Sequence, residues 1–456
     1  MAQVSLTREL VMQMLLSVSQ EEHYSHLVLR ETLDKYQFLP KQDRAFITRT
    51  FEGTVENRIK IDYWIDQVSS VKVNKMKPVI REIIRSAVYQ IVYMDSVPDS
   101  AACNEAVKLA QKKGFYSLKG FVNGVLRSIS RMKNDLPLPA KDHPKAFLSV
   151  KYSMPEWLVE KWINAYGEEI TEKILKDFLE EHATTVRVRT FCSDIDMTLN
   201  MLKEEGVSVE KAPYVDTAYA ISGYDHIPGL RAFREGRIQV QDVSSMLVSV
   251  CANPQLGDTV LDICAAPGGK SLHMADLLQG TGNVQARDLT EYKVGLIQQN
   301  IERCGVINAE AVRQDATVFD RKSVEKYDIV LADVPCSGLG VIGKKTDIKY
   351  RMDPDKIRDL VQLQRQILHN AASYVKPGGI LIYSTCTVCD EENQQNVKWL
   401  TRHYPFHAES LDPYLPPQLR SDQTQWGMLQ LLPGIHKTDG FFLARLKKEE
   451  EDGLGL

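Results

Sequence analysis

The stretch Thr259-Val-Leu-Asp-Ile-Cys-Ala-Ala-Pro-Gly-Gly-Lys270 decides the fold of this 456-residue chain. Its first five residues form a short, mainly apolar run that predicts a buried strand. A glycine pair then turns the chain into a predicted helix that runs through Leu278. A strand, a glycine turn and a helix in this order predict a doubly wound α/β domain, in which ligands bind beyond the carboxyl ends of the strands.

The alternation of strand and helix extends from about residue 236 to residue 447. Further segments are expected as strands at 283–286, 310–313, 327–333 and 379–383, and as helices at 291–303 and 355–375. The last two strands are nearly continuous apolar runs, which is typical of parallel strands covered on both faces. We therefore predict a Rossmann-like α/β domain over residues 236–447, followed by an acidic tail at 448–456.

The N-terminal region has a different pattern. Apolar residues recur at helical spacing in three clear segments, at 79–94, 100–112 and 114–129. No stretch here alternates as a strand would, so we predict an all-helical domain over residues 1–140. It ends in Asp135-Leu-Pro-Leu-Pro-Ala140, where two prolines favour an extended connector.

Residues 141–235 are expected to contain a linker and a small α+β module. The pattern predicts a helix at 155–178, a strand at 185–190, a helix at 199–205 and a strand at 207–209. Within it, Thr185-Val-Arg-Val-Arg-Thr190 alternates between apolar and polar residues, as a strand with one wet face does. The whole chain is thus predicted to be multidomain, with helical, α+β and α/β parts.

The composition excludes several classes of protein. Hydrophobic residues make up 43% and charged residues 25% of the chain, and no apolar run approaches the roughly 20 residues of a membrane span. Charged residues interrupt the N-terminal apolar pattern, unlike a signal peptide, and the eight cysteines are dispersed rather than spaced as a disulfide framework. We therefore expect a cytoplasmic protein with reduced thiols and no membrane partner.

The charge is unevenly distributed. The net charge is -4, yet residues 1–135 carry 20 Lys and Arg against 15 Asp and Glu. This modest excess is compatible with contacts to nucleic-acid phosphates. A solvated helical surface explains the same excess equally well, so charge alone leaves the partner open.

Four polar features are expected at the carboxyl edge of the predicted α/β sheet. They are the turn Cys264–Lys270, Asp288, Asp315 and Asp333, each of which ends or follows a strand. Asp288 is placed to take ribose hydroxyls, and Asp315 to meet an adenine amino group. The glycine pattern matches neither the dinucleotide nor the triphosphate fingerprint. A carboxylate-lined site suits a cationic ligand such as S-adenosylmethionine; the alternative is a tight turn with three scattered surface aspartates.

Two cysteines follow the ends of predicted strands. If these strands are adjacent, Cys336 and Cys386 point into the same crevice as the ligand. A buried cysteine is usually only a small hydrophobe, but two thiols beside a methyl donor favour covalent catalysis. Cys386 and Cys389 also form a C-x-x-C, yet no second ligand pair is suitably spaced, so no metal site is expected.

The chain resembles the NOL1/NOP2/Sun family of RNA cytosine-5 methyltransferases. The matching stretches are Val240-Gln-Asp-Val-Ser-Ser245, Leu261–Lys270, Asp333-Val-Pro-Cys-Ser-Gly-Leu-Gly340, Tyr383-Ser-Thr-Cys-Thr387, Leu432-Pro-Gly434 and Thr438-Asp-Gly-Phe-Phe442. The helical region resembles a NusB-type RNA-binding domain through Asp43-Arg-Ala-Phe46, Gly53-Thr54 and Phe121-Val-Asn-Gly-Val-Leu-Arg127. This combination is that of the bacterial members that modify the small ribosomal subunit. It implies a class I methyltransferase fold, with 16S ribosomal RNA as substrate and partner.

The resemblance also implies a role for each matching residue. Cys386 would attack carbon 6 of cytosine, Cys336 would assist release of the methylated product, and Asp333 would orient or help protonate the ring. S-adenosylmethionine would be held by Cys264, Ala265, Ala266, Pro267, Gly268, Gly269, Lys270, Asp288, Asp315 and Asp333. RNA would be approached by Lys344, Lys345 and Arg44. We expect a monomer that needs no metal.

One departure from the family pattern leaves the RNA contacts less defined. Lys344-Lys-Thr-Asp347 stands where an Arg-His-Pro-Asp-type run is expected. Three alternatives also stay open. The chain could act on another RNA such as tRNA, it could be a DNA cytosine methyltransferase with Cys336 as nucleophile, or it could be a non-catalytic RNA-binding assembly factor.

Overall fold

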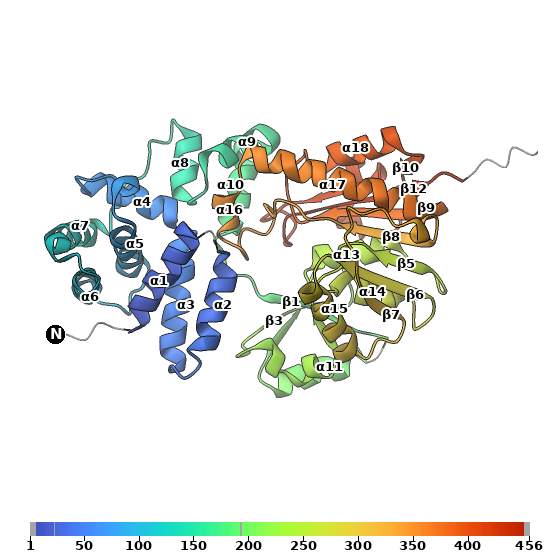
Figure 1. The fold of residues 1–456 in the computed structure, drawn as a ribbon, viewed down its shortest axis with the longest axis horizontal. Coiled ribbons are helices and arrows are strands. Elements are labelled where there is room, and N and C mark those ends of the chain that lie inside the picture. Colours follow the sequence, from blue (N-terminus) through green and yellow to red (C-terminus); the bar gives the residue numbers. More distant parts are fainter. Residues whose placement is uncertain (1–5, 22, 192–193, 451–456) are drawn as a thin grey trace, which may run out of the picture. The chain divides into compact units, whose positions relative to one another are not determined.

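The computed structural model describes residues 6–21, 23–191 and 194–450, and the chain divides into two compact units. The first unit comprises Met1–Leu179 and Ile342–Arg351, and the second comprises Glu180–Val341 and Met352–Leu456 (Figure 1). Most of the predicted acidic tail, residues 451–456, lies outside the described residues. Within the described ranges, no helix is long and apolar enough to cross a membrane.

The first unit is built from helices wherever the structure describes it. They are α1 (Leu6–Gln20), α2 (Ser25–Lys35), α3 (Lys41–Glu56), α4 (Arg58–Val68), α5 (Pro78–Tyr93), α6 (Asp99–Lys112), α7 (Lys119–Met132), α8 (Pro144–Lys151), α9 (Glu156–Tyr166), α10 (Glu168–Asp177) and α16 (Ile348–Arg351), with short 3-10 turns at Val73–Lys75 and Tyr116–Leu118. The predicted all-helical N-terminal domain is therefore confirmed. The single helix predicted at 155–178 is wrong, because Gly167 takes a φ of 80° and separates α9 from α10.

Helix α5 forms the centre of the first unit's core. Its apolar side chains pack with those of α4, α6 and α7. The polar side of this helix is buried as well, because Glu82 and Arg85 are only 1% and 7% exposed. Arg85 lies 2.6 Å from Asp62 and 2.8 Å from Glu82, so the buried guanidinium is paired on both sides.

The second unit begins with a small antiparallel sheet in the order β2-β3-β1-β4. Its strands are β1 (Thr184–Val188), β2 (Ser208–Lys211), β3 (Ala218–Ser222) and β4 (Ile238–Val240), with α11 (Ile195–Glu204), a 3-10 turn at Ile227–Gly229 and α12 (Arg231–Arg234). Helix α11 covers one face, where Met201 and Leu202 pack on Val186, Val188 and Ile221. The sequence predicted β1, α11 and β2 here, but neither β3 nor β4. The region predicted as one module is thus shared, with α8 to α10 in the first unit and this sheet in the second.

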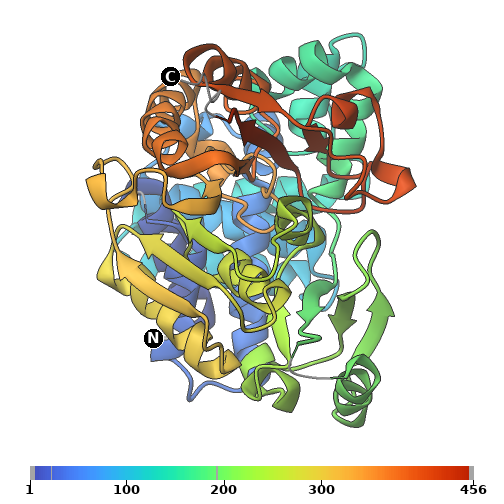
Figure 2. The ribbon, with the colours of Figure 1, turned by 90° about the vertical axis from the view of Figure 1, so that its right-hand side faces the viewer.

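The large sheet of the second unit runs in the order β10-β12-β9-β8-β5-β6-β7, with β11 paired to β12 (Figure 2). Its strands are β5 (Thr259–Asp262), β6 (Asn283–Asp288), β7 (Ala309–Arg313), β8 (Tyr327–Asp333), β9 (Val375–Thr385), β10 (Phe406–Ala408), β11 (Met428–Leu431) and β12 (Phe441–Lys448). Strands β5 to β9 are parallel, whereas β10, β11 and β12 pair antiparallel. The predicted α/β fold is confirmed, with three antiparallel strands that the sequence had not indicated.

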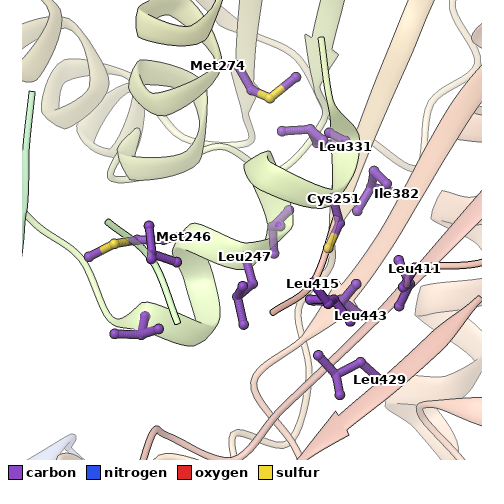
Figure 3. Close-up of a cluster of buried hydrophobic side chains, with 14 of the residues drawn as sticks. Met246, Leu247, Cys251, Met274, Leu331, Ile382, Leu411, Leu415, Leu429 and Leu443 are labelled. Carbon is purple, nitrogen blue, oxygen red and sulfur yellow. The ribbon is translucent and has the colours of Figure 1, made fainter. Parts of the chain in front are cut away.

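Helices cover both faces of this sheet. They are α13 (Val243–Ala252), α14 (Gly269–Leu277), α15 (Glu291–Cys304), α17 (Pro354–Tyr374) and α18 (Gln394–His403), with the short α19 (Asp422–Gln425) and 3-10 turns at Arg321–Ser323 and Pro417–Leu419. On one face, Leu247 of α13 and Met274 of α14 pack with strand residues such as Leu331 (Figure 3). On the other face, α17 and α18 pack on β8, β9 and β12. Because both faces are covered there, the central parallel strands β5, β8 and β9 are mainly apolar, whereas β6 and the edge strand β7 also carry polar residues.

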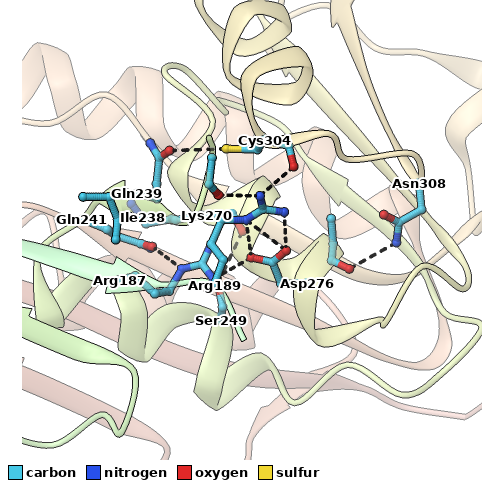
Figure 4. Close-up of polar contacts among 12 residues, drawn as sticks. Arg187, Arg189, Ile238, Gln239, Gln241, Ser249, Lys270, Asp276, Cys304 and Asn308 are labelled. Atoms are coloured by element: carbon cyan, nitrogen blue, oxygen red, sulfur yellow. Dashed lines mark hydrogen bonds and ion pairs between the residues drawn. The ribbon is translucent and has the colours of Figure 1, made fainter. Parts of the chain in front are cut away.

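A buried ion cluster joins the small sheet to α14 (Figure 4). Arg187 of β1 and Arg189, which follows this strand, both bind Asp276, at 2.6 and 2.7 Å, and Arg189 also donates to the carbonyls of Gly236 and Cys304. All three charged side chains are at most 7% exposed. One carboxylate therefore compensates two buried guanidinium groups, and the side of β1 that was predicted to be wet is buried against this helix.

We expect Asp276→Asn to destabilise the second unit by about 3 kcal/mol, because it leaves two buried guanidinium groups without a counter-charge. The measurement is hydrogen exchange at the amides of α14 and β1, which reports the free energy of opening of this region alone. The control is Asp196→Asn, which removes an exposed carboxylate of α11 and is expected to change this free energy by less than about 0.5 kcal/mol. Equal effects of the two substitutions would contradict the role of Asp276.

Candidate active site

Two cysteines meet where neighbouring parallel strands end. Strands β8 and β9 pair so that Asp333 lies opposite Ser384. Cys336 follows the first strand by three residues, and Cys386 follows the second directly. Their Sγ atoms lie 3.3 Å apart and both side chains are partly buried. The two strands that carry the cysteines are therefore adjacent, as the sequence analysis required, and the two thiols meet at one point of the sheet edge.

The two thiols differ in their surroundings. The contact with Cys386 and the burial of its own side chain raise the pKa of Cys336 well above the ordinary value of a thiol. Cys336 therefore keeps its proton at neutral pH. Since the thiolate is the reactive form of cysteine, Cys336 in this state is a poor nucleophile, and its S–H remains available as a hydrogen-bond donor.

A partly buried ion pair lies beside the thiols. Lys270, in the first turn of α14, places Nζ 2.6 Å from Oδ2 of Asp333, and the hydroxyl of Ser384 donates to Oδ1 at 2.7 Å. Burial lowers the pKa of Lys270, but Asp333, with smaller contributions from Asp262 and Cys386, raises it above its ordinary value. Lys270 thus stays protonated and presents a cation near the thiol of Cys386. The resemblance had placed this lysine with the cofactor; its closest partner in the structure is Asp333.

The glycine turn is tied to the next strand of the sheet. The N–H of Ala265 donates to the carbonyl of Arg287, and the N–H of Ala266 donates to Oδ2 of Asp288 at 3.0 Å. Gly268 takes a φ of +104°, which favours glycine, and α14 follows it immediately. The Asp288 carboxylate also lies 3.0 Å from Nζ of Lys293. Asp288 therefore helps to hold the turn.

The remaining turn residues have structural contacts too. The carbonyl of Pro267 accepts a hydrogen bond from the side chain of Asn300 at 2.9 Å. Burial raises the pKa of the Cys264 thiol, which stays neutral. Asp315, beyond β7, accepts from the N–H and the hydroxyl of Thr317 at 2.8 and 2.7 Å. Of the three predicted carboxylates, those at positions 288 and 333 thus end two parallel strands of the large sheet, and the one at 315 lies two residues beyond a third.

A fourth carboxylate at this edge was not among the predicted site residues. Asp262 ends β5, is fully buried, and accepts a hydrogen bond from the Ser271 hydroxyl on Oδ2 at 2.6 Å. Its Oδ1 is buried without a hydrogen-bond partner in the described structure. Burial raises the pKa of Asp262 to about 7. The sequence signal was a lone acid at the end of an apolar strand, next to the glycine turn.

Two glycines fix the distance between the segments that carry the cysteines. The N–H of Gly340 donates to the carbonyl of Cys386 at 3.0 Å, and the N–H of Gly440 donates to the carbonyl of Gly340 at 2.9 Å. A Cβ on Gly340 would lie 1.9 Å from the carbonyl oxygen of Gly440, so no side chain fits. The matching stretches that end at Gly340 and contain Gly440 therefore meet beside Cys386.

The predicted RNA-contacting residues belong to the first unit. Lys344 and Lys345 are exposed, whereas Arg44 on α3 is half-buried and its Nε has no hydrogen-bond partner among the described atoms. Asp347, the residue of this run that agrees with the family pattern, is only 2% exposed and accepts from the N–H and the hydroxyl of Ser25. This aspartate anchors its segment within the first unit. RNA binding by the three basic residues stays a prediction.

The C-x-x-C motif has no metal partner in the described part of the chain. There, no group of three or more His, Cys, Asp or Glu side chains is arranged to hold a metal ion. The buried thiol of Cys389 instead donates to Oε2 of Glu391 at 3.0 Å.

Comparison with known proteins gives matches along most of the chain. A family model described as 16S rRNA methyltransferase RsmB/F matches residues 249–447. A NusB family model matches residues 5–131, and a ferredoxin-like domain model of RsmF/B-like methyltransferases matches residues 154–224.

Individual proteins are similar over nearly the full length. The "Probable ribosomal RNA small subunit methyltransferase B" of Bacillus subtilis (strain 168) is 38% identical, over 97% of this chain and 98% of the relative. The "Ribosomal RNA small subunit methyltransferase B" of Klebsiella pneumoniae is 30% identical, over 90% of this chain and 92% of the relative. The crystal structure of PH0851 aligns with a TM-score of 0.80 at 28% identity, over 98% of this chain and 100% of that one.

Proposed function

This chain belongs to the 16S rRNA methyltransferase RsmB/F family, and on that premise we propose that it methylates carbon 5 of a cytosine in 16S rRNA. Family membership makes the chain an S-adenosylmethionine-dependent methyltransferase, the enzyme class that the sequence resemblance implied. The observation that carries the finer proposal is the 3.3 Å contact between Cys336 and Cys386 at adjoining strand ends. A methyl transfer to a nucleophilic nitrogen or oxygen would have no use for two thiols at this point.

The chemistry of carbon 5 explains the thiols. This carbon is a poor nucleophile until a thiolate adds to carbon 6, after which the ring behaves as an enamine. Cys386 is the attacking group in this proposal, because its thiol lies near the Lys270 ammonium while Cys336 holds its proton. Asp333, oriented by Lys270 and Ser384, is placed to hold the ring edge. After transfer, a base removes the carbon 5 proton and Cys386 leaves, with Cys336 assisting this release.

The residues at the sheet edge fit S-adenosylmethionine, which when bound supplies an electrophilic methyl group on a sulfonium. Asp288 and Asp315 would hold the nucleoside part, and the turn Cys264–Lys270 would line the other end of the site. Asp262 adds a buried oxygen without a partner, next to this turn. A buried carboxylate of this kind favours a ligand that carries positive charge, because the charge offsets the cost of its ionisation.

We expect the affinity for S-adenosylmethionine to rise with pH. The pKa of Asp262 is about 7 in the empty site, and a bound cation favours its ionised form, so binding below pH 7 must release a proton. The dissociation constant, measured by calorimetry, is expected to be about tenfold higher at pH 6 than at pH 8. In Asp262→Asn this difference should disappear. A variant that keeps the full pH dependence would assign it to another group.

The test of the function compares RNA from a deletion strain with RNA from its parent. Bisulfite sequencing of 16S rRNA is expected to show one cytosine that is fully methylated in the parent and unmethylated in the deletion strain. Purified protein should restore the mark in vitro on 16S rRNA, with tRNA as the control substrate. Restoration on tRNA but not on 16S rRNA would favour the alternative substrate. If 16S rRNA from the two strains carries the same methyl groups, the non-catalytic assembly factor would be favoured. Cytoplasmic location, a monomeric state and independence of metal stay predictions.

A further inference from the structure

Two neighbouring residues lie behind the thiols and hold the two cysteine segments separately. The first is Glu392, which is fully buried. Its Oε2 accepts the N–H of Ser337 at 2.8 Å, and its Oε1 accepts the hydroxyl of Ser337. Gln364 of α17 donates both to Oε2 of Glu392, at 2.9 Å, and to the carbonyl of Pro335, at 3.0 Å. The residues immediately before and after Cys336 are therefore both attached to this carboxylate and its partner.

The second residue is Asn393, which is also fully buried. Its Oδ1 accepts the hydroxyl of Thr385 at 2.6 Å, and its Nδ2 donates to the carbonyl of Thr387 at 3.0 Å. The residues immediately before and after Cys386 are therefore attached to this amide. Gln430 of β11 accepts a further hydrogen bond from Nδ2 at 2.8 Å.

The side chains of Glu392 and Asn393 bond different cysteine segments, although the segments also contact each other through the Gly340 N–H and the Cys386 carbonyl and through the two thiols. The hydroxyls of Ser337 and Thr387 lie 2.8 Å apart, which joins the segment of Cys336 to the segment of Cys386. Burying this many polar groups lowers the stability of the fold unless each one is hydrogen-bonded. If stability alone mattered, apolar residues could hold the loops without this desolvation cost. Hydrogen bonds define positions to a few tenths of an ångström, and covalent steps depend on such precision.

We propose that Glu392 and Asn393 are positioning residues that separately control the two covalent steps, Asn393 through Cys386 and Glu392 through Cys336. In the first step, the Cys386 thiolate forms a bond to carbon 6, and the electron pair of the carbon 5–carbon 6 double bond becomes available at carbon 5. In the second, a base takes the carbon 5 proton, the double bond re-forms, and the sulfur–carbon bond breaks to return the thiolate. This inference rests on the proposed function.

The experiment uses the full-length enzyme with 16S rRNA and follows two quantities in a single turnover. One is the covalent protein–RNA adduct on a denaturing gel, and the other is methylated RNA. Thr385→Val removes the hydroxyl that donates to Asn393, and we expect adduct formation to slow by roughly 10- to 100-fold. Ser337→Ala removes the hydroxyl that donates to Glu392. We expect the adduct to form at the normal rate but to decay roughly 10- to 100-fold more slowly.

Variants of the two central residues and a matched control complete the test. Glu392→Met should retain adduct as Ser337→Ala does, whereas Glu392→Gln keeps an acceptor for the Ser337 N–H and should restore most of the release rate. Gln395→Ala changes an exposed residue of the same segment, whose side chain bonds only Asp390 among the described contacts, and should alter neither step. Melting temperatures identify any variant of Glu392 that fails to fold. In that case Thr385→Val and Ser337→Ala, which each remove a single hydroxyl, still test the proposal.

The outcomes separate this inference from the proposed function. If Thr385→Val and Ser337→Ala slow the same step to the same degree, the division of roles is wrong although covalent catalysis stands. If neither Cys336→Ala nor Cys386→Ala, run in the same series, forms an adduct with RNA, the proposed function itself is wrong.

Discussion

Cys386→Ala is expected to abolish both the covalent RNA adduct and methyl transfer. Without a thiolate at carbon 6, carbon 5 is too weak a nucleophile to take the methyl group, and in the proposed mechanism the neighbouring Cys336 serves release and does not replace the attacking sulfur. We expect single-turnover methylation to fall by more than about 10⁴-fold, as removal of a covalent nucleophile does in other enzymes. The measurement is transfer of a labelled methyl group to 16S rRNA at saturating cofactor.

Two comparisons show that this loss is specific. Cys389→Ala removes a buried thiol three residues away that contacts Glu391, and it should keep full activity. S-adenosylmethionine affinity of Cys386→Ala should match that of the unmodified enzyme, since the glycine turn and Asp288 are intact. A variant that methylates at the normal rate would exclude Cys386 as nucleophile. It would direct attention to Cys336, as in the DNA-type alternative.

The burial of the central parallel strands explains why so much of the fold could be predicted. Parallel strands covered on both faces are nearly continuous apolar runs, and β5, β8 and β9 are of this kind. The antiparallel strands β10 and β11 are only three and four residues long, so they show no usable periodicity. Gly167, which divides one predicted helix into α9 and α10, was a single breaker in an otherwise helical pattern.

The active site could be predicted only in part, and the missing part depends on distant contacts. The cysteine pair follows from local rules, because both residues stand at strand ends. Lys270 binds Asp333 although the two are 63 positions apart in the sequence, and the sequence analysis had placed this lysine with the cofactor. The crossing of Gly340 and Gly440 depends on β12 lying beside β9. A resemblance identifies such residues as a set, but only the structure shows which of them touch.

The second large effect is expected in Cys336→Ala, which should convert the enzyme into one that stays bound to its RNA. Attack by Cys386 does not need the second thiol, so the adduct should form at a normal rate. Release does need it in the proposed mechanism, because the S–H of Cys336 would donate a hydrogen bond to the departing thiolate of Cys386 while a separate base takes the carbon 5 proton. We expect most of the enzyme to migrate as a protein–RNA complex on a denaturing gel, while turnover falls by roughly 100-fold or more.

The double variant Cys336→Ala/Cys386→Ala decides which sulfur carries the RNA. If Cys386 is the nucleophile, the complex that accumulates in Cys336→Ala must disappear when the second cysteine is also removed. If instead Cys386→Ala accumulates the complex and Cys336→Ala does not, the roles are exchanged. The Lys270 ammonium near Cys386 argues against that exchange, because a neighbouring cation favours the reactive thiolate of Cys386. Although the two sulfur atoms are only 3.3 Å apart, Cys336→Ala is therefore expected to show the protein–RNA complex on the gel and Cys386→Ala is expected to show none.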